Sequence, residues 1–172
     1  MKTLQSLLTA CMLVLVAGGC ALSDFEHARV VPGQSLQQAV AIAGSPSMQR
    51  PVAGGGLASY YVYGPSGWQT WRVLTDADAR VTGVRQVLTA ANFRDVLKPG
   101  VTTRDDVLFE LGPAGLQTDY PNIGTAVWIY RWMEVTTSMR VDLDFDRTTG
   151  ILRGYNSYWD PCPRSSLTCM GT

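Results

Sequence analysis

The stretch from Leu88 to Tyr158 decides the fold of this chain. It opens as LTAANFRDVLKPGVTTRDDVLFELGPAG over residues 88–115 and continues, after a loop, as AVWIYRWMEVTTSMRVDLDFDRTTGILRGYNSY over residues 126–158. The first part carries helix signals, whereas the second alternates apolar and polar residues between turn clusters. These patterns predict two short helices packed on a three-stranded antiparallel meander.

Capping and turn residues set the expected boundaries within this stretch. Thr102-x-x-Asp105 matches a capping box, and Gly112-Pro113 ends the helix that follows it. In the strand 138–146, four apolar residues alternate strictly with four charged ones, so we expect its apolar face to pack on the helices. The apolar residues are Met139, Val141, Leu143 and Phe145. The expected helices are 92–97 and 103–111, and the expected strands are 126–134, 138–146 and 151–158.

The preceding residues look like a looser copy of the same unit. Pro99-Gly100 recurs 67 residues after Pro32-Gly33, and Ser35-x-x-Gln38 matches a capping box in the corresponding place. Self-similarity at a fixed period indicates duplicated supersecondary units. The sequence therefore predicts an α+β fold of two tandem units, 31–88 and 89–159, each with two short helices packed on a three-stranded antiparallel meander. In the first unit we expect a helix over 36–43, a loop through Pro51, and strands over 59–63, 68–74 and 80–88.

The N-terminus carries a targeting signal. Lys2 precedes a largely apolar run, and Ala17-Gly18-Gly19-Cys20 resembles a bacterial lipobox. We expect residues 1–19 to be a signal peptide, Cys20 to carry the lipid, and 20–30 to be a tether. By resemblance to sorting in enteric bacteria, Ala21 favours the outer membrane, with the chain on its periplasmic face. The alternative is an ordinary signal peptide, or a short anchor, in which Cys20 is incidental.

Two further cysteines lie in the tail, residues 160–172. Cys162 and Cys169 fall within PCPRSSLTC. Because an exported chain meets an oxidising compartment, we expect them to form a disulfide. A metal site is the alternative, but it requires further Cys or His ligands, which the tail lacks.

Composition and motifs favour a non-catalytic protein. The chain has 14 Lys and Arg against 14 Asp and Glu, with no basic run, so a nucleic-acid partner is not expected. His27 is the only histidine and lies on the predicted tether, which argues against a Ser-His-Asp site. No HExxH motif or phosphate-binding glycine loop is present, and we expect no cofactor.

The aspartates of the strand 138–146 have a spacing that invites comparison with a calcium loop. Asp142-x-Asp144-x-Asp146 could supply oxygen ligands, but Arg147 stands where such a loop needs glycine, and no glutamate closes it. Alternation along a strand explains the same aspartates without a metal. We therefore expect a charged strand face.

The aromatic residues of the strand 126–134 offer the better functional hypothesis. Trp128, Tyr130 and Trp132 share one strand face. If the aliphatic face packs on the helices, this row lies on the open sheet face and forms an aromatic patch rimmed by charge, as is typical of a protein-binding surface. The charged residues expected beside it are Arg140, Asp142 and Asp144. The alternative is that both sheet faces are covered and the aromatics fill the contact between the two units.

Residues 98–113 and the strands after them resemble the BamE (SmpA/OmlA) lipoprotein family. The resemblance rests on Lys98-Pro99-Gly100-Val101-Thr102, Leu111-Gly112-Pro113, Trp128-Ile129-Tyr130 and Val141-x-Leu143-x-Phe145. It implies an outer-membrane lipoprotein facing the periplasm, with an accessory role in β-barrel protein assembly. Such family members carry one unit, whereas tandem units are similar to β-lactamase-inhibitor proteins, which bind a partner enzyme on a concave sheet.

The sequence therefore predicts a lipid-anchored, non-catalytic protein-binding module in the periplasm. The expected partner is a periplasmic or outer-membrane protein, with the barrel-assembly machinery as one candidate. The alternatives are an inhibitor or sensor that binds one periplasmic enzyme, and a structural lipoprotein that contacts peptidoglycan.

Overall fold

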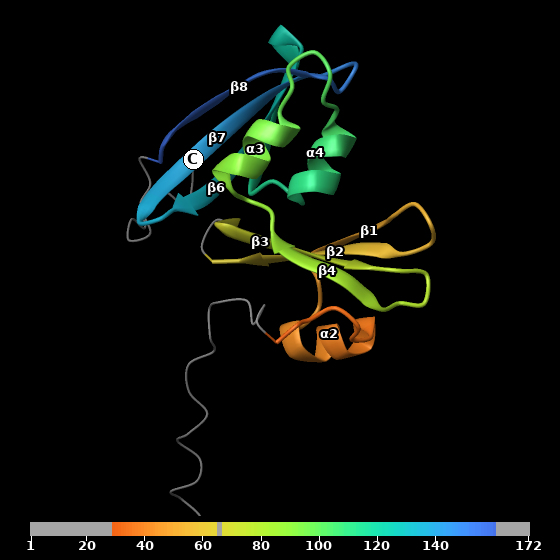
Figure 1. Ribbon diagram of the computed structural model, residues 1–172. Helices are drawn as coiled ribbons and strands as arrows, with labels where there is room; N and C mark the ends of the chain where they lie inside the picture. The colour runs from red at the N-terminus through yellow and green to blue at the C-terminus, as the bar shows by residue number, and fades with distance from the viewer. Residues whose placement is uncertain (1–28, 65–66, 161–172) are drawn as a thin grey trace, which may run out of the picture.

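The computed structural model of the chain describes residues 29–64 and 67–160 (Figure 1). The predicted signal peptide, the lipidation of Cys20 and the Cys162–Cys169 disulfide lie outside these residues and stay predictions. The elements, in chain order, are α2 (Leu36–Ala43), β1 (Met48–Pro51), β2 (Leu57–Tyr63), β3 (Gln69–Thr75), β4 (Val81–Gln86), α3 (Ala90–Val96), α4 (Arg104–Leu111), β5 (Leu116–Tyr120), the 3₁₀ helix η2 (Pro121–Ile123), β6 (Thr125–Glu134), β7 (Thr137–Asp146) and β8 (Leu152–Trp159).

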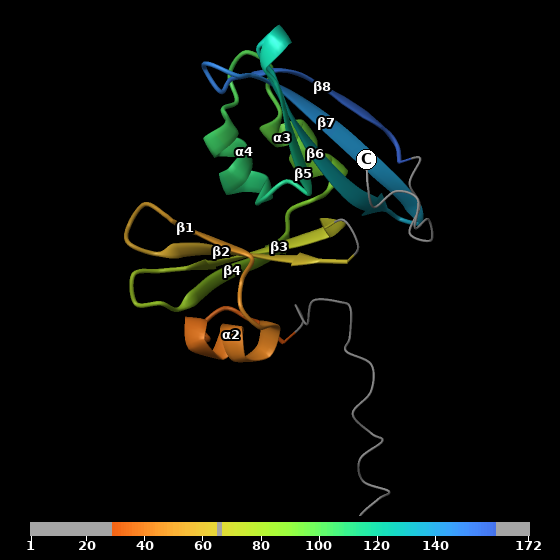
Figure 2. The same ribbon diagram turned by 180° about the vertical axis from the view of Figure 1, so that it is seen from behind.

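These elements stack in layers. Figure 1 shows α2 below the sheet β1–β4, then the pair α3 and α4, then the sheet β5–β8, and Figure 2 shows the same order from behind. Each sheet has four antiparallel strands in chain order. We call β1–β4 the first sheet and β5–β8 the second sheet. The pair α3 and α4 thus lies between the two sheets.

The predicted fold class, an α+β fold in which each unit packs two short helices on a three-stranded antiparallel meander, is wrong. In the part of the chain that the structure describes, each sheet has four strands instead of three, three α-helices are present instead of four, and strand structure predominates. The missed strands are β1, which contains Pro51, and β5, with the sequence LQTDY; both lie at sheet edges. Pro and Asp are disfavoured in strands, but an edge strand tolerates them because one side of its backbone needs no partner.

An internal repeat is nevertheless present. In each unit, the residue that caps the helix pairs with the residue just before the last strand, through the isolated bridges Ser35↔Arg80 and Thr103↔Ile151. The helices α2 and α4 each contain eight residues and end at a glycine with nearly the same backbone angles, φ 81° and ψ −168° at Gly44, and φ 79° and ψ −166° at Gly112. The repeating unit is one helix followed by four strands.

The second capping box lies one residue later than predicted. Thr103 caps α4 and forms the box with Asp106, whereas Thr102 is buried and its hydroxyl donates to the carbonyl of Val96 at 2.6 Å. The first box, Ser35 with Gln38, is as predicted. The second unit carries one extra residue between Gly100 and its cap, so a fixed offset from the first unit points to the wrong threonine.

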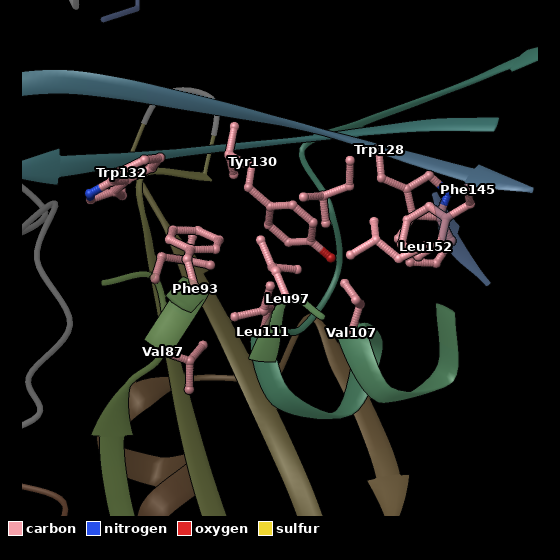
Figure 3. Close-up of a cluster of buried hydrophobic side chains, with 13 residues drawn as sticks. Val87, Phe93, Leu97, Val107, Leu111, Trp128, Tyr130, Trp132, Phe145 and Leu152 are labelled. Carbon is pink, nitrogen blue, oxygen red and sulfur yellow. The ribbon is translucent and has the colours of Figure 1, made fainter. Parts of the chain in front are cut away.

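Each unit packs its own helix on its own sheet. Ala39 of α2 packs with Tyr61, Val73 and Val81 of the first sheet in a small buried cluster. Against α3 and α4, the second sheet forms a larger one, shown in Figure 3. Burial of each large apolar side chain contributes about 1.5–3 kcal/mol. The larger cluster contains Val87, Leu88, Phe93, Leu97, Val107, Leu111, Trp128, Tyr130, Trp132, Val141, Leu143, Phe145 and Leu152.

A polar joint connects the first sheet to the end of α4. The guanidinium of Arg72, a residue only 6% exposed, donates to the carbonyl of Phe109 at 2.7 Å and pairs with Glu110 at 3.0 Å. The hydroxyl of Tyr60 donates to the same carbonyl. These two donors satisfy the Phe109 carbonyl, one of those that a helix C-terminus leaves unpaired. A Cβ at Gly112 would lie 2.9 Å from the ring of Tyr60, so the backbone there is in close contact with the first sheet.

A candidate protein-binding face on the second sheet

The predicted aromatic row does not lie on an open face. Trp128, Tyr130 and Trp132 are buried beneath the helices, and the Phe93 ring of α3 lies 4.7 Å from the Trp132 ring and 6.3 Å from the Tyr130 ring, centroid to centroid (Figure 3). The Tyr130 hydroxyl donates to the carbonyl of Gly112 at 2.9 Å, and burial raises its pKa, so it stays a donor. The hypothesis that this row is a solvent-exposed patch is therefore wrong.

Strand register explains this error. Trp128 lies opposite Leu143, and Tyr130 lies opposite Val141. Residues directly opposite in antiparallel strands share a sheet face. The apolar face of β7 does pack toward the helices, as predicted, and the aromatic row goes with it. Arg140, Asp142 and Asp144 therefore lie on the face that carries none of the three predicted aromatics.

That other face of the second sheet, which we call the open face, is not covered by any described helix or strand (Figures 1 and 2). One of its ends is closed by Asp160, which is fully buried and accepts from the Ser138 hydroxyl at 3.2 Å and pairs with Arg131 at 3.2 Å. The residues of the open face are Leu116, Thr118, Tyr120, Thr125, Val127, Ile129, Arg131, Arg140, Asp142, Asp144, Asp146, Gly154, Asn156 and Tyr158.

A polar network occupies the middle of the open face. The Arg140 guanidinium binds both carboxylate oxygens of Asp142, at 2.6 and 2.9 Å, and lies 5.6 Å from the centre of the Tyr158 ring. The Tyr158 hydroxyl donates to Asp142 at 2.7 Å. The hydrogen bond to Asp142 raises the pKa of Arg140, and burial together with Asp142 raises the pKa of Tyr158. Bidentate arginine–carboxylate pairs fix geometry, so these three side chains hold one another in place.

A second pair lies at the hairpin end of β7. Arg153 contacts Asp146 at 2.6 Å and donates to the Thr125 hydroxyl at 2.9 Å. The Asp146 carboxylate also accepts from the backbone amides of Thr148 and Thr149. The amide of Thr149, and then Arg153, lower the pKa of Asp146, because both favour its charged form. Asp146 is thus ionised, and its carboxylate is bound by Arg153 and by the amides of Thr148 and Thr149.

Asp144, between these pairs, faces a hollow. The hollow has a volume of about 390 Å³ and is lined by Tyr120, Ile123, Thr125, Val127, Asp144, Arg153 and Gly154. Within the described residues, no hydrogen bond or ion pair joins the Asp144 carboxylate. Burial, and then the charge of Asp142, raise its pKa. Its side chain therefore carries a charge that its surroundings do not stabilise.

Sequence reasoning missed the apolar part of this hollow. The sequence predicts only a loop between residue 115 and residue 126, but Tyr120 ends β5 and Ile123 ends η2, with exposed fractions of 48% and 68%. The available signal was an aromatic residue, Tyr120, and an aliphatic one, Ile123, within a predicted surface loop, because such loops are usually polar.

Among residues 29–64 and 67–160, no group of three or more His, Cys, Asp or Glu side chains is arranged to hold a metal ion. None of the helices in this described part is long and apolar enough to cross a membrane. Asp142, Asp144 and Asp146 lie along one strand face, where Asp142 pairs with Arg140 and Asp146 pairs with Arg153.

Comparisons with known proteins do not place the chain in a family. No family model and no curated protein matches it, so the resemblance to the BamE family receives no support. Matching solved structures include a DUF4309 family protein (YjgB) from Bacillus subtilis, at 15% identity over 74% of this chain and 79% of that one, with a TM-score of 0.29. A putative β-lactamase inhibitor protein from Streptococcus mutans matches at 16% identity over 77% of this chain and 87% of that one, with a TM-score of 0.31.

A third match is an extracellular protein containing an SCP domain from Bacillus anthracis. It shows 16% identity over 83% of this chain and 48% of that one, with a TM-score of 0.30. TM-scores this low do not establish a shared fold or function. Within the described residues, the architecture is two helix-and-sheet units, and no described helix or strand lies over one face of the second sheet.

Proposed function

We propose that this chain is a non-catalytic protein-binding module and that the open face of its second sheet is the contact surface. One observation supports this proposal above the others: no described helix or strand covers this face, and exposed Tyr120 and Tyr158 lie on it among charged residues, next to exposed Ile123 of η2. Aromatic and apolar side chains with a polar surround are the composition of protein interfaces.

The arrangement favours binding over chemistry. Arg140, Asp142 and Tyr158 satisfy one another, which leaves no free base beside a nucleophile among them. A rigid polar network next to an apolar hollow instead provides a pre-organised surface, which lowers the entropy cost of association.

We further propose that the module is held at the periplasmic face of the outer membrane through a lipid on Cys20. The support is the sequence Ala17-Gly18-Gly19-Cys20 alone. Replacement Cys20→Ala should release the chain from the membrane fraction, and globomycin should block its processing. Unchanged processing in globomycin would refute this location.

Site-specific photocrosslinking in cells tests the binding surface. A photoreactive residue at Ile123 should crosslink to a discrete partner protein. The matched control is the same residue at Val135, which is 93% exposed but lies in the β6–β7 turn, at the opposite end of β6. Equal crosslinking at both positions, or none at Ile123, contradicts the proposal.

The identity of the crosslinked protein separates the remaining candidates. Barrel-assembly machinery would support the accessory role that rests on the resemblance of residues 98–113. A single soluble enzyme captured at one-to-one stoichiometry would support an inhibitor or sensor instead.

A further inference from the structure

On the open face of β7, one of the three aspartates has no described arginine partner. Three aspartates alternate along this face, and two arginines pair with the outer ones: Arg140 with Asp142, and Arg153 with Asp146. Asp144 lies between them without a described partner, and it alone of the three lines the hollow. The hollow therefore contains one carboxylate that no described arginine pairs with, because the arginine in its lining, Arg153, is bound to Asp146.

Arg153 does not serve as an internal counter-ion for Asp144, although it also lines the hollow. Its guanidinium is committed to Asp146 at 2.6 Å and to the Thr125 hydroxyl at 2.9 Å. The pKa of Asp144 is raised in spite of this neighbour, with burial as the main cause and Asp142 as the second. A cation from outside the described chain would remove that penalty.

The rest of the hollow suits a long basic side chain. Tyr120 presents an aromatic ring, and Ile123 and Val127 present aliphatic surface. Lysine and arginine pack their methylene stems on apolar groups while the charged end reaches a carboxylate or an aromatic face. One carboxylate without further oxygen ligands is a poor site for a metal ion, which takes several.

The molecule contains one example of how such a sheet face is covered. The corresponding face of the first sheet carries Arg72, and it is covered by α4, which brings Glu110 to within 3.0 Å of that arginine. The first sheet thus meets a layer of opposite charge. By the same electrostatic rule, the open face of the second sheet, with its unpaired aspartate, fits a basic partner.

We infer that the hollow at Asp144 receives a lysine or arginine side chain of the partner protein, packed between Tyr120 and Ile123. This inference rests on the proposed function, because it names the chemistry of the partner at the same face. On this inference, Asp144 selects the partner, and Arg140, Asp142 and Tyr158 form the rigid polar network beside the hollow.

Two arms test the inference on the full chain. In the first, the chain in detergent is titrated with the peptide acetyl-Ala-Arg-Ala-amide, and backbone amide shifts are followed by NMR. Shifts should concentrate at Tyr120, Ile123 and Asp144, should weaken with salt, and should be absent with acetyl-Ala-Gln-Ala-amide. They should also be lost in Asp144→Asn but kept in Asp78→Asn, which removes an exposed carboxylate from the turn between β3 and β4 of the first sheet. Equal shifts with the glutamine peptide would overturn the inference.

The second arm uses the partner crosslinked at Ile123. Asp144→Asn should weaken its binding by about tenfold or more, the effect of losing one charge-assisted contact, while Asp78→Asn leaves it unchanged. Replacing the partner's contacting basic residue by glutamate should abolish binding to the parent chain and restore it to Asp144→Lys. The melting temperature of each variant checks that it is folded.

Failure of this inference and failure of the proposed function give different results. A crosslink at Ile123 whose partner presents no basic residue to Asp144 refutes the inference and leaves the binding face standing. Absence of any crosslink at Ile123 refutes both.

Discussion

The two sheets of this protein are built alike and covered differently. The first sheet has α2 on one face and α4 on the other, whereas the second sheet has helices on one face only in the described structure. One arginine on each sheet illustrates this difference in covering. Arg72 of the first sheet is buried and bonded to another unit, while Arg140 of the second is half-buried and bonded to its own strand. A duplicated unit thus offers two faces, and the one left open is the candidate for a partner.

The largest expected effect concerns the covered face of the second sheet. Trp132→Ala should lower the free energy of unfolding by about 3–5 kcal/mol, because the side chain is 3% exposed and packs on Phe93. Chemical denaturation measures this change. A loss below about 1 kcal/mol would mean that Trp132 is not in the core and would restore the exposed-patch hypothesis.

Next in size is the joint between the units. Arg72→Ala should cost about 2–3 kcal/mol, since it removes bonds to Phe109 and Glu110. The full penalty of a broken buried pair is not expected, because Glu110 keeps Arg85 at 2.9 Å. Arg50→Ala, which removes the more exposed pair with Asp105, is the control and should cost under about 1 kcal/mol in the same denaturation experiment. Equal losses would contradict a special role for the joint.

The equivalent change on the open face should be small. Arg140→Ala should lower the free energy of unfolding by about 0–1 kcal/mol, because solvent reaches the pair with Asp142. Comparison of its denaturation midpoint with that of Arg72→Ala tests the contrast between the two faces directly. A loss as large as that of Arg72→Ala would show that something outside the described residues covers the open face.

The smallest effect is a pH dependence at Asp144. Burial raises its pKa in the folded chain, so the folded state holds the proton more tightly than the unfolded state. Stability from this group is present below the ordinary pKa of about 3.9 and is lost as pH rises through the raised value. Asp144→Asn should therefore be more stable than the parent at pH 7, by under about 0.5 kcal/mol because solvent screens the charge.

Thermal melts of both chains at pH 7 and pH 3 measure this difference. It should vanish at the lower pH, where the parent carboxyl is protonated. A variant less stable than the parent at pH 7 would mean that Asp144 has a favourable partner within the chain.

Local signals predicted the helices and the long strands well. The capping box of Ser35 located α2 at its observed bounds, and the alternation along β7 identified the face that meets the helices. Both depend on residues close in sequence, where spacing and structure are directly linked.

Pairing between strands could not be read in the same way. A shift of one residue in strand register moves a whole row of side chains to the opposite sheet face. The residues next to Trp128 in the sequence do not indicate that it pairs with Leu143. The offset between the units also drifts, from 67 residues at Gly33 and Gly100 to 71 at Val81 and Leu152, which make matching backbone bonds. A single fixed period therefore misplaced the second cap.

Gly44 and Gly112 end their helices in the same backbone conformation but have different surroundings. A side chain at Gly44 would meet nothing within 4 Å, whereas one at Gly112 would strike Tyr60 and Thr70 of the other unit. The first position requires glycine for its conformation only, and the second requires it for conformation and for room. Because the two units are in such close contact, unfolding of one unit should destabilise the other. The two units should therefore unfold in a single cooperative transition and not independently.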